Sequence, residues 1–239
     1  MSEENELKRL RSIRKNLQAE NLFTNQLSSN IWFNSSDDWG VARNGGRRGS
    51  RFAPEAIINS FKKLNIDQDG LKEMIRSFEL SNSHLDSQEN FENFQREESE
   101  KIFYELQTKT QKIVHLGGGH DHIYPLVKAI KEFWPKEKIS LINIDAHLDT
   151  RQEKYPHSGT PFRQISEQWG KDIELYQWGI HSFANNAPHK EDLKFYAHHI
   201  EGLDQLKKKT QNFTQSEKFL KTLSFPGKLI LSLDCDGLH

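Results

Sequence analysis

The sequence predicts an α/β fold with a mainly parallel sheet, and three observations support this prediction. The chain has 239 residues, enough for one α/β domain with a substantial core. Two strand-like runs, at 113–116 and 139–144, flank a helical pattern at about 123–134, and such a β-α-β unit has parallel strands. Three apolar runs end in Asp or His, as expected where parallel strands meet at one edge of a sheet. No linker, repeat or low-complexity tract divides the chain, so we expect a single domain over residues 1–239.

Composition and charge narrow the class of function. A net charge of −1 gives no electrostatic reason to expect nucleic acid or an anionic membrane as a partner. No apolar run approaches the length that crosses a bilayer, and the acidic, polar start of the sequence predicts no signal peptide. The single cysteine, Cys235, cannot form an intramolecular disulfide. We therefore expect a cytoplasmic protein.

The elements of the first half are predicted from spacing and from proline. Apolar residues within 7–17 predict a short surface helix, and 31–33 predicts the first strand. The segment 34–51 is rich in Gly and Arg and is predicted to be a loop, after which Pro54 opens a helix. The phenylalanine spacing within 81–111 predicts a charged amphipathic helix over one face of the sheet, with no functional site.

The second half predicts alternating strands and helices. A loop at 150–165 precedes a fourth parallel strand at 172–178, and 195–200 predicts a short strand. A single Lys-rich helix at about 203–223 then leads to the last strand, 229–233.

The most informative stretch directly follows the strand at 139–144. Asp145, His147 and Asp149 occupy alternate positions, so on an extended backbone their side chains would share one face. Carboxylates at close range raise each other's pKa unless a cation lies between them. A divalent metal therefore explains the pattern better than a solvated acidic loop does.

Two other strand ends carry the same kinds of side chain. His120 follows the glycines 117–119, and Asp234 and Asp236 follow the last strand. The glycines lack the spacing of a phosphate-binding loop, and we expect their backbone freedom to turn His120 inward. Cys235 should point away from its two Asp neighbours and pack as a small thiol. Four carboxylates and two imidazoles suit two hard ions such as Mn²⁺ better than one Zn²⁺.

The segments GGGHD (117–121), DAHLD (145–149) and SLDCDG (232–237) resemble, in this order, the metal-binding signatures of the ureohydrolase family. That family comprises arginase, agmatinase and formimidoylglutamase. The resemblance implies a three-layer α/β/α fold and two Mn²⁺ ions per subunit. The metal ligands that it implies are His120, Asp145, His147, Asp149, Asp234 and Asp236. His120 and Asp149 would belong to one ion, and His147 and Asp236 to the other, with Asp145 and Asp234 contacting both.

The resemblance also implies a reaction, the hydrolysis of a linear C–N bond. Two bridged divalent ions lower the pKa of a shared water and stabilise the charge that develops when a planar carbon is attacked. Asp149 is the candidate general acid for the departing nitrogen. His157 is a candidate proton shuttle.

Two loops favour formimidoylglutamase within the family. The stretch NGGR (44–47) and the segment SGTPF (158–162) resemble that enzyme, whereas arginases carry a His where Ser158 stands. Two arginines could bind the two carboxylates of N-formimino-L-glutamate, although ordinary surface cations explain them equally well. The substrate contacts that we expect are Asn44, Arg47, Arg151, Ser158, Arg163 and Asn185.

We therefore expect a manganese hydrolase that converts N-formimino-L-glutamate to L-glutamate and formamide in histidine degradation. Two alternatives stay open: a guanidino-compound ureohydrolase that releases urea, and a truncated, non-catalytic metal-binding subunit. The second arises because family chains continue past the position of His239 with at least one more strand, which implies that the last part of the fold is missing. The family commonly forms trimers or hexamers, so we expect a homo-oligomer with a small-molecule substrate.

Overall fold

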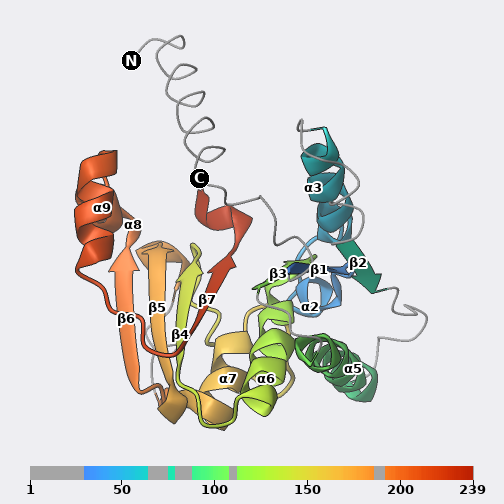
Figure 1. Cartoon of the computed structure of the whole chain (residues 1–239). Coiled ribbons are helices and arrows are strands. Elements are labelled where there is room, and N and C mark those ends of the chain that lie inside the picture. The colour runs from blue at the N-terminus through green and yellow to red at the C-terminus, as the bar shows by residue number, and fades with distance from the viewer. Residues whose placement is uncertain (1–29, 64–74, 79–87, 108–111, 186–191, 239) are drawn as a thin grey trace.

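The computed structural model of the chain describes residues 30–63, 75–78, 88–107, 112–185 and 192–238 (Figure 1). The helix predicted within 7–17 lies outside these residues. The strands are β1 (Asn30–Ser35), β2 (Ile75–Phe78), β3 (Lys112–Gly117), β4 (Ile139–Ile144), β5 (Ile173–Ile180), β6 (Ala197–Gly202) and β7 (Lys228–Leu233).

All the strand pairs are parallel, and they form two sheets with the orders β2-β1-β3 and β6-β5-β4-β7. The predicted parallel α/β fold is confirmed. Strand β4 lies between β5 and β7, so Ile144 is level with Trp178 on one side and Leu233 on the other. The carboxyl ends of β4, β5, β6 and β7 consequently meet at the upper edge of the sheet in Figure 1.

Helices cover both faces of the four-stranded sheet. The α-helices are α2 (Trp39–Arg43), α3 (Ala53–Lys62), α5 (Gln88–Leu106), α6 (Ile123–Phe133), α7 (Pro161–Trp169), α8 (Leu203–Lys209) and α9 (Phe213–Lys221). On one face, Leu141 and Leu175 belong to a large apolar cluster shared with α5, α6 and α7. On the other face, Ile142 and Tyr176 form a smaller cluster with residues of α8 and α9. Because side chains alternate along a strand, β4 and β5 supply both clusters and the arrangement has three layers.

Short 3₁₀ helices flank several of these elements. They are η2 (Ser50–Phe52), η3 (His120–His122), η5 (Ser182–Ala184) and η7 (Cys235–Leu238). A further one, η4 (Gly170–Asp172), leads into β5. No helix within the described part of the chain has both the length and the apolar character of a membrane span.

Several predicted elements differ from the structure. The single helix at 203–223 is two helices, because the chain breaks after Lys209 and the side chain of Asn212 accepts a hydrogen bond from Gln215 N to begin α9. The loop at 34–51 contains α2, and the loop at 150–165 contains the start of α7, which Pro161 opens. The strand expected at 195–200 runs two residues later, as β6.

The amphipathic helix expected within 81–111 is α5. Phe91, Phe94 and Leu106 are buried on it as the spacing predicts. Its main partner, however, is α6 and not the sheet itself. The same helix also buries the carboxylate of Glu98 completely. The amphipathic pattern alone did not predict a buried charged residue on this helix.

The glycines 117–119 serve close packing, which corrects the prediction that they supply unusual backbone angles. None of the three has a positive φ. A Cβ on Gly118 would lie 2.0 Å from the carbonyl oxygen of Asp37, and one on Gly119 would lie 2.5 Å from Asp121 Oδ1. Larger residues therefore cannot occupy this turn without moving the backbone beside it.

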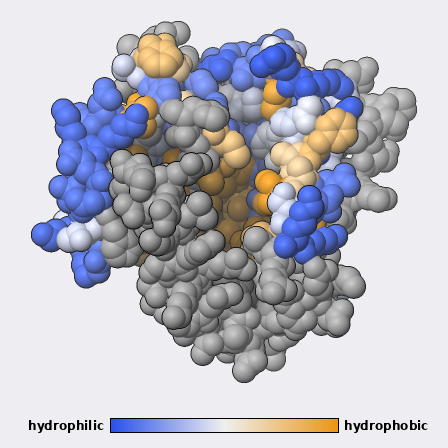
Figure 2. Space-filling view, turned by 90° about the horizontal axis from the view of Figure 1, so that it is seen from above, coloured by the Kyte–Doolittle hydropathy of each residue, from blue (hydrophilic) through white to orange (hydrophobic). Residues whose placement is uncertain are grey.

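Strand β7 leaves one of its faces open among the described residues. Leu229, Leu231 and Leu233 alternate along it and are 56%, 64% and 53% exposed. Figure 2 views the molecule from above and shows apolar surface within a central hollow. Alternation has thus placed a row of leucines where β7 has no covering layer in the described part of the chain.

Candidate metal centre

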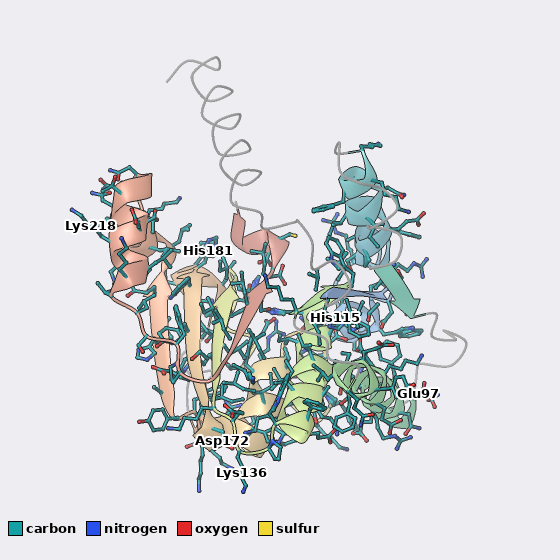
Figure 3. All side chains as sticks on the ribbon, viewed as in Figure 1. Glu97, His115, Lys136, Asp172, His181 and Lys218 are labelled. Atoms are coloured by element: carbon teal, nitrogen blue, oxygen red, sulfur yellow. The ribbon has the colours of Figure 1, made fainter. Side chains whose placement is uncertain are left out.

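The predicted metal ligands lie on three turns at one edge of the molecule. They follow β3, β4 and β7 and lie in η3, in the loop 145–149 and in the turn 234–236, which includes the start of η7. Hydrogen bonds continue past the ends of the strands, since Asp234 N donates to Ile144 O at 2.9 Å and Asp145 N donates to Trp178 O at 3.0 Å. In Figure 3, His181 marks this edge at the end of β5, whereas Asp172 and Lys136 mark the opposite edge.

The first group of ligand atoms surrounds His120. Its Nδ1 lies 3.0 Å from Asp145 Oδ2, 2.9 Å from Asp149 Oδ2 and 3.6 Å from Asp234 Oδ2. The other ring nitrogen, Nε2, lies 2.9 Å from Ser232 Oγ. A metal-binding histidine is usually held in this way through its second nitrogen, which here aims Nδ1 at the carboxylates.

The second group consists of Asp145, His147 and Asp236. His147 Nδ1 lies 3.0 Å from Asp236 Oδ2 and 3.6 Å from Asp145 Oδ1. In each of the groups His120–Asp145–Asp234 and Asp145–His147–Asp236 the ligand atoms lie within 4.8 Å of one another. The two oxygens of Asp145 therefore face different groups, as a carboxylate shared by two cations would.

The loop 145–149 is not extended, which corrects the reasoning that predicted this convergence. Strand β4 ends at Ile144, and Asp149 has a left-handed φ of 48°. His147 N donates to Asp145 Oδ1 at 2.7 Å, so the chain turns back on itself after Asp145. The side chains meet because the loop bends. The alternation of side chains along an extended strand does not explain their contact.

The turn after β7 corrects a second prediction. Residues 235–238 form η7 in place of a continued strand. Cys235 is consequently exposed and is not a packed thiol. Asp236 N donates to Asp234 Oδ1 at 3.2 Å within this turn.

Electrostatics show that the cluster suits a cation. Burial raises the pKa of Asp149 and of Asp234, and neighbouring carboxylates raise both further against the opposing effect of His120. Burial also acts to raise the pKa of Asp145, but hydrogen bonds from His120 and His147 outweigh it and the net shift is downward. Hydrogen bonds to Asp145 and Asp236 raise the pKa of His147 to about 10. His120 and His147 are the imidazoles that face these carboxylates, and a divalent cation would displace the protons that they bind.

Three of the predicted substrate contacts form one hydrogen-bonded network. Arg151 Nη1 donates to Asn44 Oδ1 at 2.6 Å, and Asn44 Nδ2 donates to Ser158 Oγ at 3.1 Å. A Cβ on Gly159 would lie 3.0 Å from Arg151 Cζ, so this glycine lets the guanidinium lie against the loop. The network joins the end of α2 to the loop that follows Asp149.

The other predicted contacts have different surroundings. Asn185 donates to Ala146 O at 2.9 Å and to His181 O at 2.8 Å, and it accepts from Leu148 N at 2.8 Å. These bonds use both amide hydrogens, so Asn185 holds the loop 145–149 in place and is not available to donate to a substrate. Its predicted contact with a substrate stays a prediction.

The surroundings of the last three predicted residues also differ from one another. Arg163 is buried in α7 and donates from Nε to Thr150 O at 3.1 Å, so it is not a surface cation. Arg47 is exposed on its loop. His157 is buried, and its Nδ1 accepts a hydrogen bond from Gly159 N at 3.0 Å. Burial lowers the pKa of His157, and the bond to Gly159 leaves only Nε2 for a proton-shuttle role.

The sequence reasoning missed two side chains that position the ligands. Asn143 is fully buried in β4, and its Nδ2 donates to Asp145 Oδ2 at 3.2 Å. Ser232, which holds His120, lies two residues before Asp234 on β7. Both are polar residues inside apolar strands, two positions before a predicted ligand. That spacing could have indicated their role from the sequence.

With the site described, comparison with known proteins places the chain in a family. The arginase family matches residues 38–239, so the chain belongs to that family and has its fold. Among curated proteins, the formimidoylglutamases of Staphylococcus epidermidis and Staphylococcus aureus are 38% identical over 131 residues and 36% identical over 135 residues. Each match covers 55% of this chain, and the chain spans only 40% of the length of each relative.

Solved structures agree on the fold. A Trypanosoma cruzi formiminoglutamase variant solved with Mn²⁺ has a TM-score of 0.64 at 24% identity, covering 92% of this chain and 74% of that one. The formimidoylglutamase of Bacillus subtilis has a TM-score of 0.66 at 20% identity, covering 86% of this chain and 64% of that one.

Proposed function

We propose that the chain carries the two-manganese site of a hydrolase that converts N-formimino-L-glutamate to L-glutamate and formamide, a step of histidine degradation. The observation that carries the proposal is the pair of ligand groups that share Asp145. When bound, two such ions lower the pKa of a water and stabilise negative charge during hydrolysis. The exposure of the sole cysteine, Cys235, supports a reducing compartment, and the proposal places the reaction in the cytoplasm.

The proposed ligands are the six residues that the sequence motifs indicate. His120, Asp145, Asp149 and Asp234 would hold the more buried ion, whereas His147, Asp236 and again Asp145 would hold the ion nearer to solvent. The side chains of His147 and Asp236 are 40% and 49% exposed, against 6% for His120, which supports this difference in depth.

Asp149 is the proposed general acid. Its carboxylate lies against His120 inside the cluster, where it would take up the proton that a water loses and pass it to the departing nitrogen. Its left-handed backbone also turns it toward the cluster, where the bond is to be broken.

The proposed substrate site is the network of Asn44, Arg151 and Ser158. Arg151 follows Asp149 by two residues and uses Nη1 to bind Asn44. A guanidinium at this position attracts the carboxylates of formiminoglutamate and repels a cationic guanidino substrate such as agmatine. Arg47 is proposed as a further contact, from the NGGR loop that resembles formimidoylglutamase.

A substrate panel tests the proposal on the full chain loaded with Mn²⁺. We expect formamide from N-formimino-L-glutamate and no urea from L-arginine or agmatine. Urea without formamide would reject the substrate, and two bound ions without any hydrolysis would favour a non-catalytic metal-binding subunit. Arg151→Ala should raise KM about tenfold by removing a charged contact. Arg96→Ala, on the exposed side of α5, is the control.

A further inference from the structure

A second set of metal-ligand side chains lies inside the molecule, between α5 and the three-stranded sheet. Glu98 of α5, His115 of β3 and His122 of η3 present ligand atoms within 4.8 Å of one another. The side chain of Glu98 is fully buried, and those of His115 and His122 are 5% and 4% exposed. Figure 3 shows His115 near the strands, while Glu97, one residue before Glu98, lies at the outer side of α5.

The atoms of this group are spaced as ligands of one ion would be. His115 Nε2 lies 2.9 Å from Glu98 Oε1, and His122 Nδ1 lies 2.9 Å from Glu98 Oε2. Ser35 Oγ adds a fourth donor atom, 2.9 Å from His115 Nε2 and in contact with Glu98 Oε1. Tetrahedral ligands bound at about 2.1 Å lie about 3.4 Å apart, so these atoms would move apart by a few tenths of an ångström to bind an ion. The same imidazole–carboxylate spacing occurs in the candidate metal centre, where His147 lies 3.0 Å from Asp236.

The surroundings of His122 Nε2 support a metal on the other ring nitrogen, Nδ1. His122 Nε2 faces Asp37 Oδ2 at 3.4 Å, and neither atom has a hydrogen-bond partner within the described residues. A histidine that binds a metal through one nitrogen commonly directs its other N–H at a carboxylate. An ion on Nδ1 places the remaining proton on Nε2, where it points toward Asp37.

We propose that Glu98, His115 and His122, with Ser35, form a separate structural site for a borderline divalent cation such as Zn²⁺. Two imidazoles and one carboxylate are a known zinc ligand set, whereas Mn²⁺ favours sites richer in oxygen. The site joins β1, β3, α5 and η3. Because η3 also carries His120, this cation fixes the turn from which the candidate metal centre receives a ligand.

Metal analysis tests the proposal in the full chain, in a background that lacks the candidate metal centre. The background is His120→Asn, Asp145→Asn and His147→Asn, purified after exposure to Zn²⁺ and dialysis against a weak chelator. We expect about one Zn²⁺ per chain. Adding Glu98→Gln should remove it, and adding the matched control Glu97→Gln should not.

Two outcomes overturn the proposal. One is a folded background protein without zinc, and the other is zinc that persists after Glu98→Gln. Either result would mean that Glu98 of the unsubstituted chain is hydrogen-bonded to two histidines without an ion. If Glu98→Gln prevents folding, X-ray absorption spectroscopy at the zinc edge of the background protein identifies the ligands of the bound zinc. Nitrogen and oxygen at about 2.1 Å with the scattering of two imidazoles is expected, and a spectrum without imidazole overturns the site. The background lacks three of the six proposed manganese ligands and the readout is bound zinc, so none of these results depends on hydrolase activity.

Discussion

His147 is the more accessible of the two histidines in the candidate metal centre, and its removal gives the simplest residue-level prediction. His147→Asn takes an imidazole from the group with Asp145 and Asp236, so Mn²⁺ affinity should fall by at least about 100-fold at that position. Isothermal titration calorimetry should then show one tightly bound Mn²⁺ ion per chain in place of two. His199→Asn is the control, because His199 is about as exposed and also lies 3.0 Å from a carboxylate, that of Glu174. Unchanged binding in His147→Asn would contradict the assignment.

The protonation of the same histidines predicts how manganese binding depends on pH. Hydrogen bonds to carboxylates raise the pKa of His147 to about 10. Burial acts to lower the pKa of His120, but its bonds to Asp145 and Asp149 outweigh burial and the net shift is upward. Both imidazoles must lose a proton to bind a metal, so affinity should rise with pH, by up to about 100-fold per unit where two protons leave.

Calorimetry at pH 6.5, 7.5 and 8.5 measures this dependence. Repeating the titration in buffers of different ionisation enthalpy counts the protons released. A dissociation constant that does not change over this range would show that the histidines are neutral before the metal binds.

At the residue scale, the sequence indicates which side chains gather in the cluster better than it indicates supporting roles. Asp145, His147 and Asp149 stand in one short motif, and the structure brings them together. Asn185 was expected at the substrate, but its partners at Ala146 and Leu148 lie nearly forty residues earlier in the chain. No local pattern reveals such a partner, because the contact exists only once β4 and β5 are paired.

At the scale of elements, Asn185 connects the turn after β5 to the loop after β4. Asn185→Ala removes two donated bonds and leaves the buried Leu148 N–H without its acceptor, so unfolding free energy should fall by about 3 kcal/mol. Urea denaturation measures the change. Asn185→Asp keeps the oxygen that accepts from Leu148 N and loses the donated bonds, so it should lie between wild type and Asn185→Ala. Equal stabilities of all three proteins would show that the loop is held by other contacts.

The strands were predictable as elements and the short helices were not. Runs such as Ile139–Ile144 are apolar over their whole length, which is typical of buried parallel strands. Helix α2 has five residues around a glycine and depends on its contact with η3, so no periodicity could indicate it. The break between α8 and α9 rests on the cap at Asn212, a single residue in a long polar stretch.

At the scale of the whole molecule, β7 presents a row of leucines that should drive association. Leu231 is 64% exposed between two other exposed leucines. Leu231→Lys should therefore lower light scattering at equal protein concentration, without changing the circular dichroism spectrum. Ile230→Lys is the contrasting variant, because Ile230 is 5% exposed and its replacement should unfold the protein. If the scattering of Leu231→Lys equals that of the unsubstituted protein, this face does not mediate association.

Strand order is the part of the fold that the sequence left open. The β-α-β pattern implies that β3 and β4 run in the same direction, but they belong to different sheets. Pairing depends on which apolar faces meet in three dimensions, and spacing along the chain does not record this.

The position of His120 has a consequence for how the protein melts. His120 follows β3 of one sheet, whereas its partners Asp145, Asp149 and Asp234 follow β4 and β7 of the other, and the described strands form no hydrogen-bonded pair between the two sheets. A cation at this position would join the turn after β3 to the turns after β4 and β7, in addition to the apolar cluster that both sheets share. Loss of manganese on heating should therefore report when these three turns move apart.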